Sequence, residues 1–209
     1  MLDVIIKNLV NGITLIEDEF GAINKILSKQ IGAYAASSGK KVCYLESPEG
    51  ESPNGGLGRY SDQGFEVPPE DIENTGVALK NTVVYRTDQR YLPLEELKFD
   101  LIVFDSFSSY VFGKSDKEVV DLMDEIVRLS NGGKSFVLTS EAGMLDDRIN
   151  SYIRATADSV VIVRAEIQQY KVNRLLFIPK MKGTKPLDRV IKVTVEDEGI
   201  DIDTREFVG

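Results

Sequence analysis

The sequence predicts a three-layer α/β fold, in which a mostly parallel sheet carries helices on both faces and is followed by antiparallel strands. Three observations predict it. Strand-like and helix-like segments alternate over residues 12–156. The unbroken apolar run of residues 101–104 is typical of a strand buried on both faces. After residue 158 only short strand-like segments follow. With 209 residues, 42% of them hydrophobic, we expect residues 1–209 to form a single domain.

The first elements follow from apolar runs and the turn residues that separate them. We expect a strand over residues 12–17, a helix over 22–37 that Ser38 and Gly39 end, and a second strand over 41–46. Residues 47–76 are rich in Gly, Pro and Ser and hold few apolar residues. This composition predicts a long loop or an insertion.

The middle of the chain continues the alternation of strands and helices. Strands are predicted over residues 81–87, 99–106 and 134–141. Apolar residues recur at helical spacing between residues 116 and 129, and the sequence "NGG" ends that helix. Another helix is predicted over residues 145–156. Residues 159–209 form a C-terminal extension whose strands we expect to be antiparallel and added to one edge of the sheet.

Composition excludes several classes of function. The formal net charge is −9, which argues against nucleic acid and anionic membranes as partners, because both are bound by Lys and Arg. The chain has no histidine and one cysteine, which excludes a histidine-based triad and an internal disulfide and argues against a zinc site. Cys43 lies in a predicted strand, where we expect an inert core thiol. Without a signal peptide or a long apolar run, we expect a cytoplasmic protein.

Asp105 and Ser106 end the apolar run of residues 101–104. Open α/β sheets bind ligands at the carboxyl ends of their strands, and in nucleotide hydrolases an aspartate at this place orients magnesium. Asp-Ser after a strand is also a common way to start a helix. Both interpretations stay open from these residues alone.

Taken in order, several segments resemble the KaiC-like branch of the RecA-like P-loop ATPases, of the archaeal type. The matching segments are "GITLIEDEFGAINK" (12–25), "LIVFDSFSS" (101–109), "FVLTSE" (136–141), "ATADSVVIV" (155–163) and "RLLFIPKMKGTKP" (174–186). The resemblance covers most of the chain and implies a RecA-like fold. It also implies that Asp105 and Ser106 are the Walker B residues, with Asp105 as the magnesium ligand.

The phosphate loop departs from the family's pattern. Aligning the family's "GEPGSGKT" with residues 18–25 leaves agreement only at Glu19 and Gly21. Asn24 takes the place of the lysine, Lys25 that of the magnesium-binding hydroxyl, and Asp18 that of a glycine. Shifting the alignment by one residue makes Lys25 the phosphate lysine, but it puts Asn24 where a glycine is needed and Ile26 where the hydroxyl is needed, so neither register restores the site. The Walker A motif is therefore predicted to be degenerate.

Electrostatics and sterics agree with that mismatch. Glu17, Asp18 and Glu19 place three carboxylates where a triphosphate would have to bind. Each close pair of like charges costs about 1 kcal/mol in water and about 4 kcal/mol at a protein surface. Ile23 also replaces a glycine where the backbone has to approach a phosphate. We expect no cofactor, or ATP with magnesium bound weakly.

The resemblance assigns roles to residues outside the loop, and each has a simpler alternative. The family's catalytic base corresponds to Glu46 or Glu49, although the simpler interpretation of both is as solvated loop carboxylates. The resemblance further implies three sensor-like residues at the end of a strand beside Asp105, and two basic residues that act across a subunit boundary. The sensor-like residues are Thr139, Ser140 and Glu141, and the basic residues are Lys180 and Lys182. The first three are alternatively a polar strand end that caps the next helix. The lysines are alternatively surface residues, or partners of the carboxylates in a neighbouring subunit's loop.

The predicted function is a non-hydrolysing scaffold or regulatory protein that acts through protein partners or self-association. This prediction is based on the family's segments that the chain retains, together with the Gly-Lys-Thr of the phosphate loop that it lacks. The alternative is a regulatory ATP-binding module or a weak ATPase, as the resemblance to archaeal motor-accessory proteins implies. A recombinase that handles DNA is disfavoured by the acidic charge.

Overall fold

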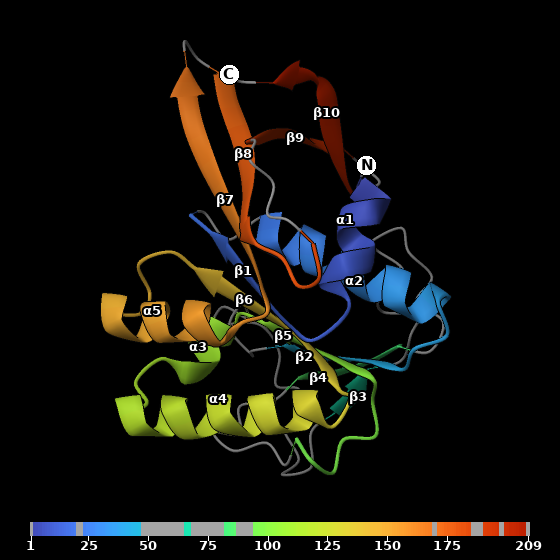
Figure 1. Cartoon of the computed structure of the whole chain (residues 1–209), viewed down its shortest axis with the longest axis vertical. Helices are drawn as coiled ribbons and strands as arrows, with labels where there is room; N and C mark the ends of the chain where they lie inside the picture. Colours follow the sequence, from blue (N-terminus) through green and yellow to red (C-terminus); the bar gives the residue numbers. More distant parts are fainter. Residues whose placement is uncertain are drawn as a thin grey trace, which may run out of the picture.

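The computed structural model describes residues 2–19, 23–46, 65–67, 82–86, 94–168, 171–184, 190–196 and 199–207 (Figure 1). Their strands form one mixed sheet in the order β10-β9-β8-β7-β1-β6-β5-β2-β4-β3. The strands are β1 (Ile13–Asp18), β2 (Val42–Glu46), β3 (Phe65–Val67), β4 (Thr82–Arg86), β5 (Leu101–Asp105), β6 (Ser135–Glu141), β7 (Ser159–Gln168), β8 (Lys171–Lys180), β9 (Ile191–Glu196) and β10 (Gly199–Phe207).

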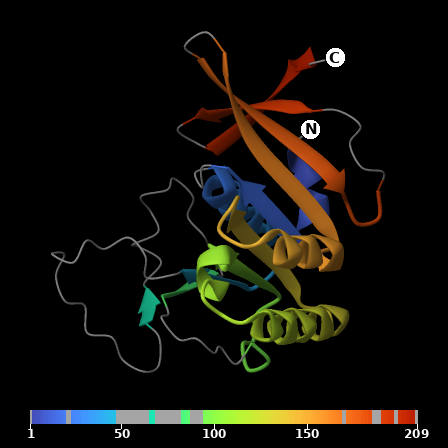
Figure 2. The same ribbon diagram turned by 90° about the vertical axis from the view of Figure 1, so that its left-hand side faces the viewer.

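Helices cover both faces of this sheet, so the predicted α/β fold is confirmed. They are α1 (Leu2–Leu9), α2 (Ile23–Ser37), α3 (Phe107–Val111), α4 (Asp116–Asn131) and α5 (Asp147–Thr156). Helices α1 and α2 lie on one face, and α3, α4 and α5 lie on the other (Figures 1 and 2). The strands from β7 to β4 are parallel to one another, whereas β8, β9 and β10 pair antiparallel.

The core is divided by the sheet into two clusters, and the alternation of side chains along each strand assigns residues to them. In β5, Leu101 and Val103 pack toward α1 and α2, whereas Ile102 and Phe104 pack toward α3, α4 and α5. All four are buried, which is why residues 101–104 of this strand are all apolar. Cys43 of β2 is buried as predicted, and burial raises the pKa of its thiol to about 12.

The structure differs from the sequence prediction in three elements. Strand β7, expected to be antiparallel with the rest of the extension, runs parallel to β1, with Thr14 opposite Ser159. Helix α5 returns the chain across the sheet before β7, which is the connection that a parallel strand requires. Strand β3 lies within the predicted loop 47–76, whose other residues are outside the described ranges. Helix α1 was not predicted.

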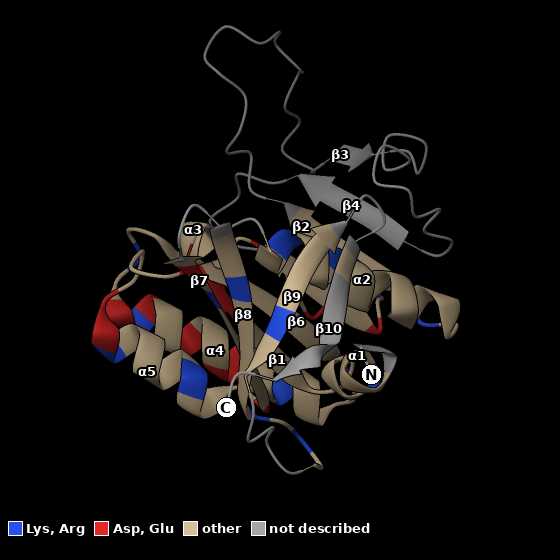
Figure 3. Ribbon diagram, turned by 90° about the horizontal axis from the view of Figure 1, so that it is seen from above, with Lys and Arg blue, Asp and Glu red and all other residues tan. Residues whose placement is uncertain are grey.

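The strands β7 and β8 form a long hairpin that extends beyond the helices (Figure 1). Near its tip Ile167 and Val172 lie opposite each other, and they are 78% and 53% exposed. Among the described side chains, Lys and Arg lie on β8 and β9, whereas Asp and Glu cluster at the start of α5 (Figure 3). The extension thus adds an apolar tip and local positive charge to an acidic protein.

Candidate functional site

The carboxyl ends of four neighbouring parallel strands each carry an acidic residue. In the order β1, β6, β5 and β2 these residues are Asp18, Glu141, Asp105 and Glu46. Strand register places Asp18 opposite Glu141 and Asp105 opposite Glu46. The structure therefore brings together the strand ends that the sequence singled out, at the edge where open α/β sheets bind ligands.

Asp18 hydrogen-bonds to the first turn of α2. Its Oδ2 accepts from the backbone N–H of Ile23 at 2.7 Å and from that of Asn24 at 3.2 Å. The Asp18 side chain is buried, with its residue 3% exposed. These two N–H groups begin the helix that follows the loop, so a carboxylate of the chain occupies the acceptor position of the helix N-terminus. Gly21 lies outside the described residues.

Asn24 and Lys25 occupy the two places where the resemblance requires a lysine and a hydroxyl. Asn24 is fully buried, and its Oδ1 accepts from the backbone N–H of Lys25 at 2.6 Å. Its Nδ2 has no hydrogen-bond partner among the described residues. Lys25 is exposed. Neither residue supplies a buried cation at the first turn of α2.

The other two carboxylates of the loop are satisfied within the chain. Glu17 Oε2 forms an ion pair with Arg154 Nε of α5 at 2.8 Å, and the Glu17 side chain is only 6% exposed. Glu19 Oε2 accepts a hydrogen bond from the backbone N–H of Ala165 at 3.2 Å. These acidic groups therefore have partners without the lysines of a neighbouring subunit.

A network of hydroxyl groups links the ends of β5 and β6. The Ser106 backbone lies in the left-handed region, with φ 65° and ψ 64°, and its N–H donates to Thr139 Oγ1 at 2.6 Å. Thr139 Oγ1 in turn donates to the Phe104 carbonyl at 3.1 Å. Ser106 Oγ lies 3.0 Å from Glu141 Oε2, to which Ser108 also donates. Thr139 and Glu141 thus hold the turn between β5 and α3.

This network bears on the two interpretations of the sensor-like residues. Helix α5, which follows β6, is capped by Asp146 and by none of Thr139, Ser140 or Glu141. Ser140 is buried and lies opposite Glu17 in the parallel pair of β6 with β1. The predicted capping of the next helix is therefore wrong, because Thr139 and Glu141 hydrogen-bond instead to the turn before α3 and to its first residues.

Asp105 is buried at the end of β5, beside Glu46 of β2 in the strand register. The Glu46 side chain and Glu49 lie outside what the structure describes, so the catalytic base stays a prediction. Among the described side chains, no three His, Cys, Asp or Glu residues come together as metal ligands. A single carboxylate can hold magnesium together with water and phosphate, so magnesium at Asp105 also stays a prediction.

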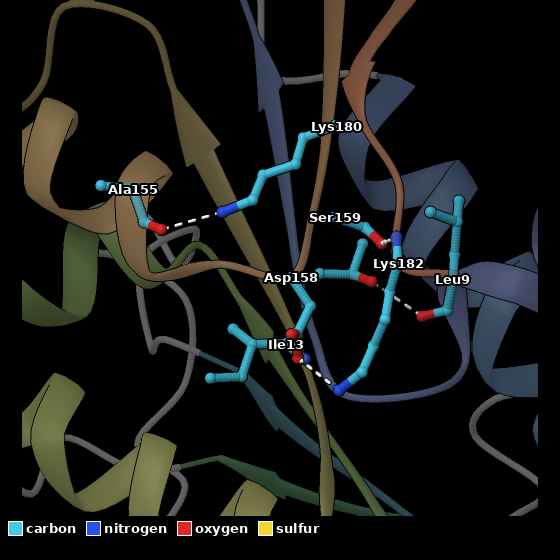
Figure 4. A network of polar contacts seen from close by, with 8 residues as sticks. Leu9, Ile13, Ala155, Asp158, Ser159, Lys180 and Lys182 are labelled. Atoms are coloured by element: carbon cyan, nitrogen blue, oxygen red, sulfur yellow. Dashed lines mark hydrogen bonds and ion pairs between the residues drawn. The ribbon is translucent and has the colours of Figure 1, made fainter. Parts of the chain in front are cut away.

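The two basic residues of the C-terminal segment lie at the other edge of the sheet, near the start of β1 (Figure 4). Lys180 Nζ donates to the Ala155 carbonyl at 2.8 Å. Lys182 Nζ pairs with Asp158 Oδ2 at 3.0 Å, and the same oxygen accepts from the Ile13 N–H at 2.9 Å. Both lysines are exposed and contact their own chain.

Sequence reasoning missed two charged residues that the structure places in these networks. Arg154 neutralises Glu17, and Asp158 joins the starts of β1 and β7 to Lys182. Asp158 immediately precedes β7 and lies within the segment "ATADSVVIV" that carries the resemblance, which was the available signal for it. Arg154 carries no comparable signal, because a cation in the last turn of a helix is ordinary.

Comparison with known proteins shows which fold this is. No family model matches the chain, and no curated protein matches it in sequence. The flagellar accessory protein FlaH from Methanocaldococcus jannaschii is similar in structure, with a TM-score of 0.69, 16% identity, and 92% of this chain and 89% of that chain covered. The KaiC-like protein PH0186 from Pyrococcus horikoshii OT3 matches with a TM-score of 0.67, 14% identity and the same coverage of 92% and 89%.

These similarities establish a KaiC-like RecA fold for the chain. They confirm the predicted α/β architecture, including the antiparallel strands that follow the parallel part of the sheet. Separately, none of the helices within the described ranges is both long and apolar enough to cross a membrane.

Proposed function

We propose that this protein is a non-hydrolysing scaffold or regulator with a KaiC-like RecA fold and a degenerate Walker A motif. It acts through protein contacts, in the cytoplasm of an archaeal-type cell, and not on nucleic acid. The observation that carries the proposal is the row of acidic strand ends, Asp18, Glu141, Asp105 and Glu46, at the edge where this fold would bind a triphosphate.

A triphosphate at this edge would need positive charge close to the strand ends. Among the described residues, Arg154 is already paired with Glu17, and Lys25 is exposed on the first turn of α2. Each pair of like charges about 4 Å apart costs about 4 kcal/mol at an effective dielectric constant of about 20. The expected affinity for ATP is therefore low, and magnesium at Asp105 would neutralise only part of the repulsion.

Two features support a role in protein contacts. One structural neighbour, FlaH, is a flagellar accessory protein, and an accessory protein works together with other proteins. In this chain the hairpin tip presents Ile167 and Val172, 78% and 53% exposed. Large apolar side chains exposed together are more typical of an interaction surface than of a surface that stays in water. Self-association through this tip is part of the proposal.

A second function, a regulatory ATP-binding module or a weak ATPase, is favoured by a different observation. Asp105 ends β5 and Ser106 follows it, as a Walker B pair would, and Thr139 donates to the carbonyl of Phe104 next to them. In that case ATP would bind with magnesium held by Asp105, and Lys180 and Lys182 of another subunit would complete the site.

The test is calorimetric titration of nucleotide-stripped protein with Mg-ATP up to about 5 mM, together with a hydrolysis assay. We expect no binding heat, no rise in melting temperature and no turnover that Asp105→Asn reduces. Saturable binding below about 100 μM, which corresponds to about −5.5 kcal/mol, would favour the regulatory module instead. Turnover that is lost in Asp105→Asn would establish an ATPase.

A further inference from the structure

We infer that Asp18 is the built-in occupant of the anion site of this fold. Its carboxylate takes the place of a phosphate group at the N-terminus of α2 and holds the helix as a bound anion would. The inference rests on the proposed function and deepens it, because it names what fills the degenerate site. The ligand class that Asp18 replaces is a phosphate or diphosphate group.

The hydrogen bonds at the start of α2 are the first step. The first N–H groups of a helix have no partner within it, and they carry the positive end of the helix dipole. Phosphate groups bind there for both reasons. In this chain one oxygen, Asp18 Oδ2, accepts from Ile23 N at 2.7 Å and from Asn24 N at 3.2 Å. A negatively charged oxygen is thus already present.

Burial is the second step. Asp18, Ile23 and Asn24 are 3%, 2% and 0% exposed. A competing anion in solution cannot reach the two N–H groups while the carboxylate covers them. Binding of an external phosphate would therefore require Asp18 to move out of a buried position.

Asn24 provides an independent observation at the same turn. Its amide is folded back over the start of the helix, because its Oδ1 accepts from the N–H of the next residue, Lys25, at 2.6 Å. Its Nδ2 is buried and has no hydrogen-bond partner among the described residues. Buried donors are rarely left without an acceptor. This group is a third donor at the turn, and a phosphate has more acceptor oxygens than the single carboxylate oxygen now bound there.

A second aspartate in the chain shows how Asp18 differs from an ordinary cap. Asp146 Oδ1 accepts from the N–H groups of Arg148 and Ile149 at 3.0 and 2.9 Å. It is exposed and directly precedes α5. Asp18 instead ends β1, five residues before Ile23, so its hydrogen bonds close the loop between strand and helix. In a phosphate-binding loop that closure is made around the bound phosphate.

The experiment removes each aspartate in the full-length protein and offers inorganic pyrophosphate. Asp18→Ala and Asp146→Ala each remove an acceptor of two backbone N–H groups, and each is expected to lower the melting temperature by about 2–4 °C. Addition of 10 mM pyrophosphate, with ionic strength held constant by NaCl, should recover half or more of the loss in Asp18→Ala. It should leave the wild type and Asp146→Ala unchanged.

Asp18→Asn keeps the test decisive if the alanine variant does not fold. It retains an acceptor oxygen and loses the charge. In ¹H–¹⁵N spectra the amide signals of Ile23 and Asn24 should shift on adding pyrophosphate to Asp18→Asn and stay in place in the wild type. The inference is overturned if the wild type responds as strongly as the variant, or if neither Asp18 variant responds more than Asp146→Ala.

The outcomes also separate this inference from the proposed function. Binding of Mg-ATP by the wild type would contradict the proposed function, whatever the Asp18 variants do. A failure of both Asp18 variants to respond to pyrophosphate would contradict only the inference, because the site could be inactive for other reasons. Recovery in Asp18→Ala without ATP binding by the wild type supports both.

Discussion

At each end of strand β1 a carboxylate accepts backbone hydrogen bonds, but the two carboxylate charges are balanced in different ways. At the start, Asp158 Oδ2 accepts from Ile13 N at 2.9 Å and pairs with Lys182 Nζ at 3.0 Å. At the end, Asp18 Oδ2 accepts from Ile23 N at 2.7 Å and from Asn24 N at 3.2 Å. One carboxylate is balanced by an ammonium group, and the other faces a helix N-terminus.

The difference is that a similar residue joins three structural elements at one edge and, at the other, accepts from the first N–H groups of a helix, where we infer that it replaces a ligand. At the start of β1 a half-exposed ion pair ties β7 and the chain after β8 to the sheet. At the end of β1 the carboxylate lies at a helix N-terminus, which in general attracts anions, so an external anion would compete with Asp18 for the same N–H groups. The nearby Glu17 needs its own cation, Arg154.

The largest effect is expected from Gly12→Ala, at the start of β1. Gly12 has φ +74°, and an added Cβ would overlap Asp158 Oδ2 and approach Lys182 Nζ. The left-handed backbone costs alanine about 1–2 kcal/mol, and losing the acceptor of a buried N–H costs about 1–3 kcal/mol. We expect a loss of about 3 kcal/mol in the free energy of unfolding, measured by urea denaturation.

Gly39→Ala is the matched control for that variant. Gly39 has φ +89°, but nothing lies within 4 Å of the added Cβ. Only the backbone term remains, so the expected loss is about 1 kcal/mol. Equal losses in the two variants would mean that displacing Asp158 costs nothing, and that the start of β1 does not depend on this carboxylate.

An intermediate effect is expected from Arg154→Ala, near the end of β1. This change leaves Glu17, whose side chain is 6% exposed, without its cation. An unsatisfied buried acceptor costs about 1–3 kcal/mol. Because Arg154 is half-exposed, we expect a loss of about 2 kcal/mol in the free energy of unfolding, measured by urea denaturation. Glu17→Gln in the same background should recover part of this loss, because it removes the unpaired charge.

Arg148→Ala is the corresponding control in the same helix. Arg148 pairs with Asp116, and these side chains are 79% and 46% exposed. Exposed ion pairs contribute about 0–1 kcal/mol, so the expected loss is within about 0.5 kcal/mol. A similar loss for Arg154→Ala would show that Glu17 is hydrated in solution and needs no partner.

Much of the fold was predictable because local patterns and tertiary structure agree in the parallel part of the sheet. The apolar run of β5 arises because both faces of this strand are buried. The helical spacing of apolar residues in α4 arises because one face of this helix is buried. The direction of β7 was missed, because strand alternation carries no information about orientation. Helix α1 was missed although Ile5, Ile6 and Leu9 recur at helical spacing, because eight residues are too few for that spacing to stand out in the sequence.

The site was predictable in position but not in its contacts. The predicted strands put Asp105 and Glu141 at strand ends and Asp18 directly after a strand, and these positions meet because parallel strands end at the same edge of the sheet. Which group each carboxylate binds depends on distant residues. Arg154 reaches Glu17 across 137 positions, and Ser108 reaches Glu141 across 33. No local pattern encodes such pairings, so the structure was needed to show that these charges are satisfied internally.

The smallest effect is expected from Lys182→Met, which removes the ammonium group from Asp158 at the start of β1. The Lys182 and Asp158 side chains are 53% and 30% exposed, so the loss in the free energy of unfolding should be about 0.5 kcal/mol. Asp158 would still accept from the Ile13 N–H. The difference in the free energy of unfolding between Lys182→Met and the wild type should shrink as the NaCl concentration rises from about 0.05 to about 1 M, because the screening length falls to about 3 Å at 1 M.

Lys180→Met gives this prediction a control with an uncharged partner. Lys180 Nζ donates to the carbonyl of Ala155 at 2.8 Å, so its removal should cost the same at every salt concentration. A salt-independent loss in Lys182→Met would mean that Asp158 is held by its backbone hydrogen bond alone. The two ends of β1 would then be alike, each a carboxylate balanced by N–H groups, and the ammonium group would have no structural part in the comparison.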